Sequence, residues 1–138
     1  MSVEANKAAF QRFFEEAANK GDLGVIDELF DSNVVYHLPG SEPVRGPEGV
    51  KGVVSAFRTA FPDLHVTIEQ FIGEGETIAA RVTPRGTNTG ELMGMAPTGK
   101  QAQWSVVHVC RFSNGRIAED RITFDQLGFL QQLGLAPA

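Results

Sequence analysis

Two ionisable side chains of complementary type, His108 and Asp120, lie on either side of the turn sequence Ser113-Asn114-Gly115. An imidazole and a carboxylate that share a hydrogen bond can move a proton to and from a substrate, which is general acid–base catalysis. Burying such groups costs free energy unless they are paired, so an inward-facing pair is either a satisfied core contact or a working site. The elements that position the two side chains must decide between these readings.

The stretch from Lys100 to Asp125 is rich in β-branched and aromatic residues and predicts two strands joined at this turn. A two-residue Asn-Gly turn would pair His108 with Arg121, whereas a three-residue loop pairs His108 with Asp120. The second register separates apolar from polar side chains more cleanly, and a one-residue slip would reverse every side chain. We therefore predict the three-residue loop, with His108 and Asp120 on an inward face that also carries Trp104, Val106, Cys110, Phe112, Ala118, Ile122 and Phe124.

Apolar stripes at helical spacing predict three helices in the first half of the chain. Ser2 can cap a first helix that runs to about Lys20, and Asp22 can cap a second, short helix. Pro47 suits the first turn of a third helix, which Pro62 ends.

Alternation of apolar and polar residues then predicts strands at 64–69 and 77–85, and Val34–Leu38 reads as one further short strand. Asp125 can cap a last short helix that carries Leu127, Leu130 and Leu133 and ends at Gly134. Helices followed by a four-strand meander predict an α+β fold with a curved antiparallel sheet. Because three helices cannot lie flat on a small sheet, we expect a cone-shaped sheet wrapped around them, which leaves an apolar pocket in a single domain of residues 1–138.

Composition narrows the range of partners. The net charge of −5, with scattered basic residues, argues against nucleic acid and anionic membranes. No metal-ligand spacing and no apolar stretch of membrane-spanning length occurs, so we expect no metal, no cofactor and a cytoplasmic location. The single cysteine, Cys110, reads as a small buried thiol.

Short motifs follow one another along nearly the whole chain: Val35–Gly40, Arg45–Gly49, Phe61–Leu64, the glycine-rich stretch Arg85–Lys100, Arg111-Phe112, Gly115–Ile117 and Phe124–Gly134. In this order they resemble the SnoaL-like polyketide cyclase family of the nuclear-transport-factor-2-like superfamily. The resemblance implies a cone-shaped α+β barrel, usually a dimer, in which relatives close polyketide rings by an intramolecular aldol reaction without a cofactor.

The resemblance also implies roles for particular residues. His108 matches the histidine that assists an acid–base aspartate in the family. The position of that aspartate, fourteen residues later, is Ile122 in this chain, and it follows Arg121 instead of tryptophan. Asp120 is the nearest carboxylate on the same predicted face. Asn88 occupies a place in the glycine-rich loop where many relatives carry histidine.

Further side chains are candidates for substrate contact: His37, Met93, Met95, Trp104, Ile122 and Phe124. The two methionines would form an adaptable rim, and Trp104 would suit a flat ligand. Ordinary packing is the alternative interpretation of the methionines and the tryptophan, and a satisfied loop histidine is the alternative for His37. Tyr36, the only tyrosine, has the opposite strand parity and could supply a hydrogen-bond donor if its face is the inner one.

These residues favour a small cofactor-independent enzyme that acts on an apolar, ketone-bearing molecule by proton transfer, as polyketide (aldol) cyclases do. In this hypothesis Asp120 takes the proton and His108 donates to the developing enolate. The alternatives are an epoxide hydrolase or isomerase of the same fold, and a ligand-binding module that has lost its aspartate at Ile122. We also expect a homodimer through the outer sheet face, where Val107 and Val109 interrupt the polar pattern.

Overall fold

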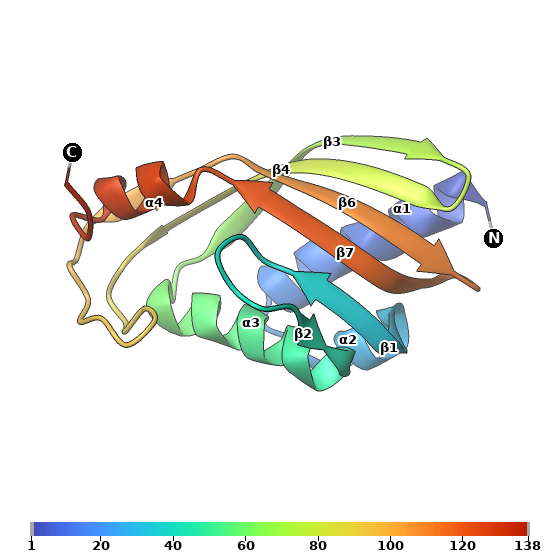
Figure 1. The fold of residues 1–138 in the computed structure, drawn as a ribbon, viewed down its shortest axis with the longest axis horizontal. Coiled ribbons are helices and arrows are strands. Elements are labelled where there is room, and N and C mark those ends of the chain that lie inside the picture. The colour runs from blue at the N-terminus through green and yellow to red at the C-terminus, as the bar shows by residue number, and fades with distance from the viewer. Residues whose placement is uncertain (1, 138) are drawn as a thin grey trace.

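The computed structural model describes residues 2–137 and shows one curved sheet with helices packed against one of its faces (Figure 1). The helices are α1 (Val3–Arg12), its π-helical continuation η1 (Phe13–Ala18), α2 (Gly24–Leu29), α3 (Gly46–Ala60) and α4 (Gln126–Gln132). The strands are β1 (Phe30–His37), β2 (Val44–Arg45), β3 (His65–Glu74), β4 (Thr77–Thr87), β5 (Gln101–Gln103), β6 (Val106–Ser113) and β7 (Arg116–Phe124).

The sheet is mixed, and the prediction of an antiparallel sheet is therefore wrong in one place. Its strands run in the order β2-β1-β7-β6-β4-β3, with β5 paired to β4. The predicted meander of β3, β4, β6 and β7 is antiparallel throughout, but β1 lies parallel to β7. Alternation along a strand reports which side chains face inward and carries no information about the direction of a distant neighbour, so the parallel pair was not visible in the sequence.

Local helix signals are mostly confirmed. The Ser2 side chain accepts a hydrogen bond of 3.0 Å from Ala5 N, and Asp125 accepts one of 2.9 Å from Gly128 N. Pro47 lies in the first turn of α3. The predicted Asp22 cap is wrong, because α2 begins only at Gly24 and has no side-chain cap.

The first helix widens into a π-helical turn where a continuous α-helix is predicted. Asn19 N donates to Phe14 O at 2.9 Å, a five-residue step in place of the four-residue step of an α-helix. The wider turn lets both members of the pair Phe13 and Phe14 be buried on the sheet side. The π-helical turn thus brings two adjacent aromatic rings to the interior. A sequence pattern at α-helical spacing cannot reveal such a turn.

The hairpin turn between β6 and β7 has two residues, so the predicted three-residue loop is wrong. Ser113 pairs with Arg116 across Asn114 and Gly115, whose φ angles of 52° and 79° are the positive values that such a turn requires. A β-bulge follows at once, because Ala118 is the extra residue on β7.

The bulge changes the register but restores the predicted inward face. His108 lies opposite Ile122, and Asp120 lies opposite Cys110. The prediction that His108 and Asp120 are directly opposed is wrong, yet both point inward because the extra residue reverses the parity that the two-residue turn alone would impose. The two side chains are therefore diagonal neighbours across the strand pair.

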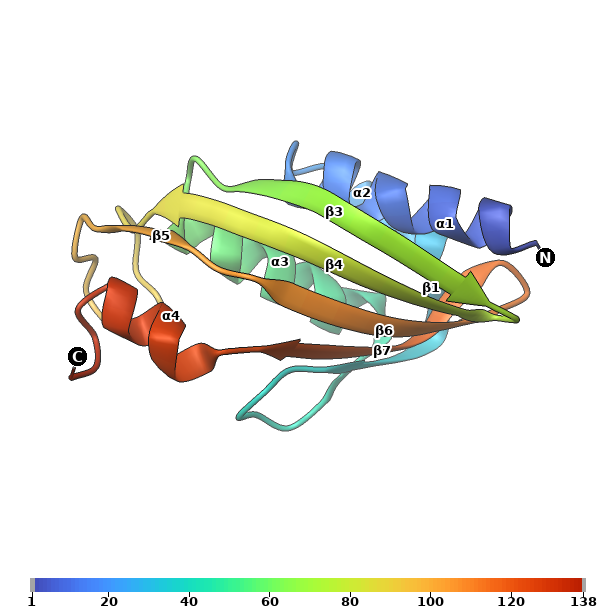
Figure 2. The same ribbon diagram turned by 90° about the horizontal axis from the view of Figure 1, so that it is seen from above.

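Apolar side chains fill the space between the helices and the inner sheet face. Ile78, Ala80 and Val82, alternate residues of β4, are buried. At the last helix Leu127 is 59% exposed, whereas Phe129 of α4 and Leu133 just after it are buried. Figure 2 shows α1, α2 and α3 on the same side of the sheet, which leaves its other face uncovered by helices. Across residues 2–137 no helix is long and apolar enough to cross a membrane.

Candidate active site

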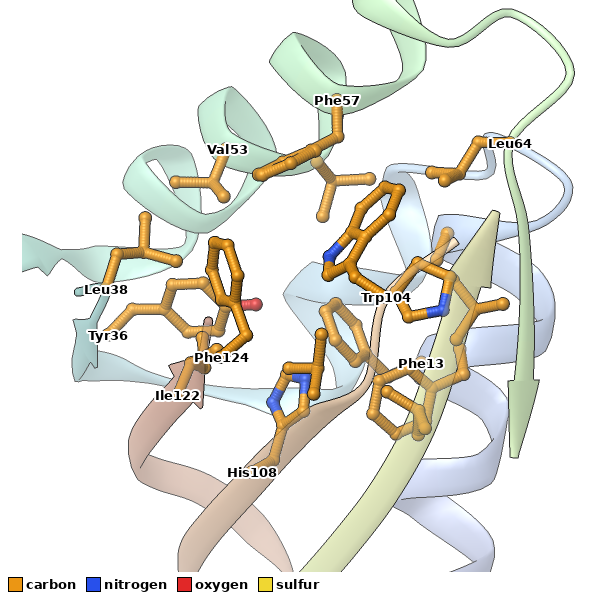
Figure 3. A pocket seen from close by; sticks show the side chains of 17 residues that line it. Phe13, Tyr36, Leu38, Val53, Phe57, Leu64, Trp104, His108, Ile122 and Phe124 are labelled. Atoms are coloured by element: carbon orange, nitrogen blue, oxygen red, sulfur yellow. The ribbon is translucent and has the colours of Figure 1, made fainter. Parts of the chain in front are cut away.

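An apolar pocket of about 90 Å³ lies between η1, α3 and the inner face of the sheet (Figure 3). Its walls come from elements that are distant in sequence: Phe13 and Phe14 of η1, Tyr36 of β1, Val53 and Phe57 of α3, Trp104 before β6, and Ile122 and Phe124 of β7. His108 also lines this mostly apolar wall, and no Asp, Glu, Lys or Arg lies among the lining residues. Trp104, Ile122 and Phe124, which the sequence offered as candidates for substrate contact, all line this pocket.

His108 and Asp120 form a buried hydrogen-bonded pair. The distance from His108 Nδ1 to Asp120 Oδ2 is 2.8 Å, and the two side chains are 7% and 0% exposed. His108 lines the pocket, whereas Asp120 lies behind it and does not. The second carboxylate oxygen, Asp120 Oδ1, is buried without a hydrogen-bond partner among the described residues. Asp120 therefore reaches the pocket only through the imidazole of His108.

The ring of His108 is held by aromatic side chains as well as by Asp120. Phe10 and Phe14 meet it edge to face, with ring centroids 5.5 and 5.1 Å away. When Asp120 is ionised its oxygens only accept, and Nδ1 of His108 then carries the hydrogen of the shared bond. In the neutral ring the other nitrogen, Nε2, then has a free lone pair, which is the arrangement of a general base.

Tyr36 and Trp104 bring two hydrogen-bond donors to the same pocket. In Figure 3 the Tyr36 hydroxyl and the Trp104 indole nitrogen turn toward the space above His108. Tyr36 is the parallel neighbour of Asp120 and is 4% exposed. Burial, followed by the nearby Asp120 carboxylate, raises the pKa of Tyr36 well above its usual value, so the phenol keeps its hydrogen. Tyr36, rather than His37, is thus the residue of this strand that faces inward.

The structure places His37, a sequence candidate for substrate contact, outside the pocket. His37 Nε2 lies 2.9 Å from Glu119 Oε2, and the two side chains are 24% and 29% exposed. Successive residues of a strand face opposite sides of the sheet, so an inward Tyr36 requires an outward His37. The satisfied-histidine interpretation fits this placement.

Neither methionine of the predicted rim lines the pocket. Met93 is 63% exposed and borders a separate outer groove. Met95 is held by two backbone hydrogen bonds with Leu92, of 3.1 and 2.8 Å, in a tight turn of the glycine-rich loop. The same loop is anchored by Asn88, which is fully buried and whose side chain bonds Gly90 O and Thr98 N at 2.8 and 3.0 Å.

Sequence reasoning missed several pocket residues. Phe13 and Phe14 lie within the predicted first helix, and both line the pocket from its π-helical continuation η1; the pair of adjacent aromatic residues was the available signal. Val53 and Phe57 likewise lie on the inner face of α3, and both line the pocket. Cys110 is completely buried beside Asp120, and burial and that carboxylate raise the pKa of its thiol, which makes it a poor nucleophile. Residues 2–137 contain no cluster of His, Cys, Asp or Glu that could hold a metal ion.

Comparison with known proteins gives one consistent result. The family described as SnoaL-like polyketide cyclase matches residues 8–133. The chain is 33% identical over 134 residues to the aklanonic acid methyl ester cyclase AcmA of Streptomyces galilaeus. This alignment covers 94% of this chain and 92% of AcmA. It is 32% identical over 120 residues to the nogalonic acid methyl ester cyclase of Streptomyces nogalater. This alignment covers 86% of this chain and 90% of that enzyme.

A solved structure shows the same fold. The SnoaL-like protein from Jannaschia sp. CCS1 superposes with a TM-score of 0.90 over 99% of this chain and 95% of its own, at 22% sequence identity. The family match extends from α1 to the end of α4 and includes every element that borders the pocket. The chain therefore belongs to the SnoaL-like polyketide cyclase family.

Proposed function

We propose that this protein is a cofactor-independent polyketide cyclase that closes a ring in an apolar, ketone-bearing polyketide ester by acid–base proton transfer. The observation that carries the proposal is the His108–Asp120 pair, in which an imidazole held by a buried carboxylate at 2.8 Å faces an apolar pocket. The relatives AcmA and the S. nogalater enzyme are named as cyclases of aklanonic and nogalonic acid methyl esters, which supports a substrate of the same class.

In the proposed reaction His108 is the base. Its Nε2 takes a proton from the carbon next to a substrate carbonyl, and the electron pair of the broken C–H bond moves onto the carbonyl oxygen as an enolate. Donors in the pocket wall, the Tyr36 hydroxyl and the Trp104 N–H, stabilise that oxygen. The enolate carbon attacks a second carbonyl of the same molecule, a C–C bond forms, and the new alkoxide recovers the proton from the imidazolium.

Asp120 has a supporting role in this scheme, which differs from its sequence-based role as the base. Because it lies behind His108 and not in the pocket, it orients the ring and stabilises the imidazolium that forms during turnover. Asp120 is a positioning residue, and His108 is the group that touches the substrate.

The change Asp120→Asn tests this assignment. Asparagine keeps the shape but loses the charge, so turnover of aklanonic acid methyl ester is expected to fall by about 10²–10⁴-fold with the fold retained. Glu119→Gln, the neighbouring carboxylate on the other face, is the matched control. Circular dichroism of both variants serves as the control for folding. Wild-type turnover in Asp120→Asn would contradict the proposal.

A second candidate function is a ligand-binding module without cyclase activity. Ile122 favours it, because this residue occupies the family's aspartate position, lies directly opposite His108 and lines the pocket. The change Ile122→Asp separates the two candidates. If it creates cyclase activity in an otherwise inactive chain, while Asp120→Asn has no effect on ligand binding, the chain is a module that has lost catalysis.

We further propose that two copies of the chain associate through the outer face of the sheet. Val107 and Val109 of β6 are 40% and 45% exposed on that face. Exposed apolar side chains on an uncovered sheet face are typical of an interaction surface. Light scattering is expected to give twice the 14.9 kDa mass of the chain, and a monomer at high concentration would contradict the dimer.

A further inference from the structure

A polar junction joins three walls of the apolar pocket at the C-terminal end of η1. Its centre is Asn19, the residue after η1, whose side-chain amide accepts from Val66 N at 2.7 Å and donates to Val66 O at 3.0 Å. Arg58 of α3 donates to Ala18 O at 2.7 Å and to Asn19 O at 3.1 Å. Ala18 and Val66 both line the pocket, so the junction ties η1 to α3 and to β3 at the pocket wall.

The junction supplies partners to backbone groups at two exposed ends of the fold. Both bonds of the Asn19 amide go to the backbone of β3, which is the last strand of the sheet and has no further strand beyond it. The last carbonyls of a helix have no partner within the helix, and the guanidinium of Arg58 supplies one. Gly21 leaves room for this group, because a Cβ atom there would lie 2.9 Å from Arg58 Nε.

Asn19 also closes the π-helical turn of η1. Its backbone N–H donates to Phe14 O at 2.9 Å, which is the five-residue step that widens the helix. Such a turn is rare compared with the α-helical step, so contacts from outside the helix are needed to hold it. The bonds from Asn19 to β3 and from α3 to Asn19 are contacts of this kind.

Phe14 connects the turn to the imidazole of the inner pair. Its ring meets the ring of His108 edge to face, with the centroids 5.1 Å apart, and both side chains line the pocket. On its other side the imidazole is bonded to Asp120 at 2.8 Å. A continuous series of contacts therefore runs from Arg58 through Asn19 and Phe14 to His108, and a contiguous series of this kind can transmit a change in position.

We infer that Asn19, held by Arg58, is a positioning residue for the imidazole of His108. It keeps Phe14 against the ring and thereby keeps water away from the bond between Nδ1 and Asp120. Neither Asn19 nor Arg58 lines the pocket, so both act through Phe14 and not by touching a substrate. The consequence for turnover rests on the proposed function, whereas the effect on the ring can be measured without any reaction.

Two substitutions break the junction at different points. Asn19→Ala removes the bonds to β3, and Arg58→Met keeps the aliphatic stem but removes the donors to the end of η1. Arg58→Met leaves the Asn19 amide in place, so it tests the inference even if Asn19→Ala does not fold. Gln11→Ala is the matched control, because the Gln11 amide lies on the preceding helix α1 and bonds the exposed Glu15 at 2.9 Å.

NMR spectroscopy follows the imidazole directly. A nuclear Overhauser effect between the ring protons of Phe14 and His108 reports their contact, and exchange of the Nδ1 hydrogen with water reports the shielding of the bond to Asp120. The backbone N–H of Ile78, a completely buried residue of β4, is the internal reference for opening of the whole sheet. A general loss of stability raises both exchange rates together, whereas a displaced Phe14 raises only that of the ring. His108→Gln identifies the signals among the three histidines.

Asn19→Ala and Arg58→Met are expected to weaken the Overhauser effect and to raise the ring exchange rate, relative to that of Ile78, by at least about tenfold, whereas Gln11→Ala changes neither. Arg58→Lys, which can still donate to one carbonyl, recovers part of the loss. Turnover of aklanonic acid methyl ester should fall by about 10–100-fold in the first two variants, because a displacement of about 1 Å can cost about 10²-fold.

Two results would overturn the positioning role. One is an unchanged Overhauser effect and rate ratio in both variants, whatever their Tm, and the other is a fall in turnover while the ring signals stay as in the wild type. If the ring responds as expected but the wild type does not cyclise the ester, the proposed reaction fails and the positioning of His108 by Asn19 stands.

Discussion

The sheet carries two histidine–carboxylate pairs of nearly equal length on its opposite faces. His108 and Asp120 approach to 2.8 Å on the inner face, and His37 and Glu119 approach to 2.9 Å on the outer face. The two carboxylates are consecutive residues of β7, so the pleat of one strand sends them to opposite sides. The same chemical pair has thus been built twice, a few ångströms apart.

The surroundings of the two pairs differ. The inner side chains are 7% and 0% exposed, and aromatic rings pack against the imidazole. The outer side chains are 24% and 29% exposed, and Arg121 approaches Glu119 to 3.3 Å. Water and competing charges weaken the outer pair, whereas a low-polarity environment strengthens hydrogen bonds in the inner one. The two pairs share their geometry and differ in their environment, and this difference is the reason for proposing only the inner pair as an acid–base device.

Replacing each histidine gives the largest expected contrast. His108→Gln removes the proposed base, and turnover is expected to fall by about 10²–10⁴-fold. His37→Gln, on the outer face, is expected to change turnover by less than about twofold. Steady-state kinetics with aklanonic acid methyl ester measure both variants. Equal losses in the two variants would remove the functional distinction between the faces.

Truncating the two carboxylates to alanine should destabilise the protein more at the inner pair than at the outer pair. Asp120→Ala leaves the buried imidazole of His108 without its partner, and a loss of about 3–5 kcal/mol in the free energy of unfolding is expected. Glu119→Ala breaks only a part-exposed pair and should cost about 0–1 kcal/mol. Urea denaturation followed by circular dichroism measures the difference. A larger loss for Glu119→Ala would show that the buried pair contributes little.

The outer pair should be visible in the pH dependence of stability. The hydrogen bond from His37, together with the charges of Arg121 and Arg111, holds the pKa of Glu119 below its usual value. A carboxyl group with a lowered folded-state pKa contributes stability above its unfolded pKa of about 4.3, and the contribution disappears as the pH falls through the folded pKa. The difference in Tm between wild type and Glu119→Gln should therefore shrink below about pH 4. A difference that grows in acid, or that is insensitive to added salt, is incompatible with this account.

The smallest expected effect concerns Cys110, the cross-strand neighbour of Asp120 on the inner face. Burial raises the pKa of its thiol, and the adjacent carboxylate adds to the shift. Iodoacetamide is therefore expected to leave the folded protein unmodified and to alkylate it only in denaturant, as mass spectrometry can show. Rapid alkylation of the folded chain would mean that the inner face opens to solvent.

Signals that act over a few residues were enough to predict much of the fold. Ser2 and Asp125 cap helices as their sequence contexts indicate, because a cap depends only on the next turn of backbone. The inward faces of β4 and β6 follow from alternation along a single strand. On the same local grounds the sequence placed both His108 and Asp120 on the inner face, and the pair is indeed hydrogen-bonded.

Other features depend on contacts between distant parts of the chain, and only the tertiary structure decided them. The parallel pairing of β1 with β7 sets Tyr36 beside Asp120 and turns His37 outward. The bulge at Ala118 determines the register across the hairpin. Which member of the inner pair faces the pocket also depends on how helices and sheet enclose it, and that packing puts His108 in the wall with Asp120 behind it. Residue type determined which side chains can exchange protons, whereas long-range packing decided which of them faces the pocket, because solvent access and direction are properties of the assembled fold.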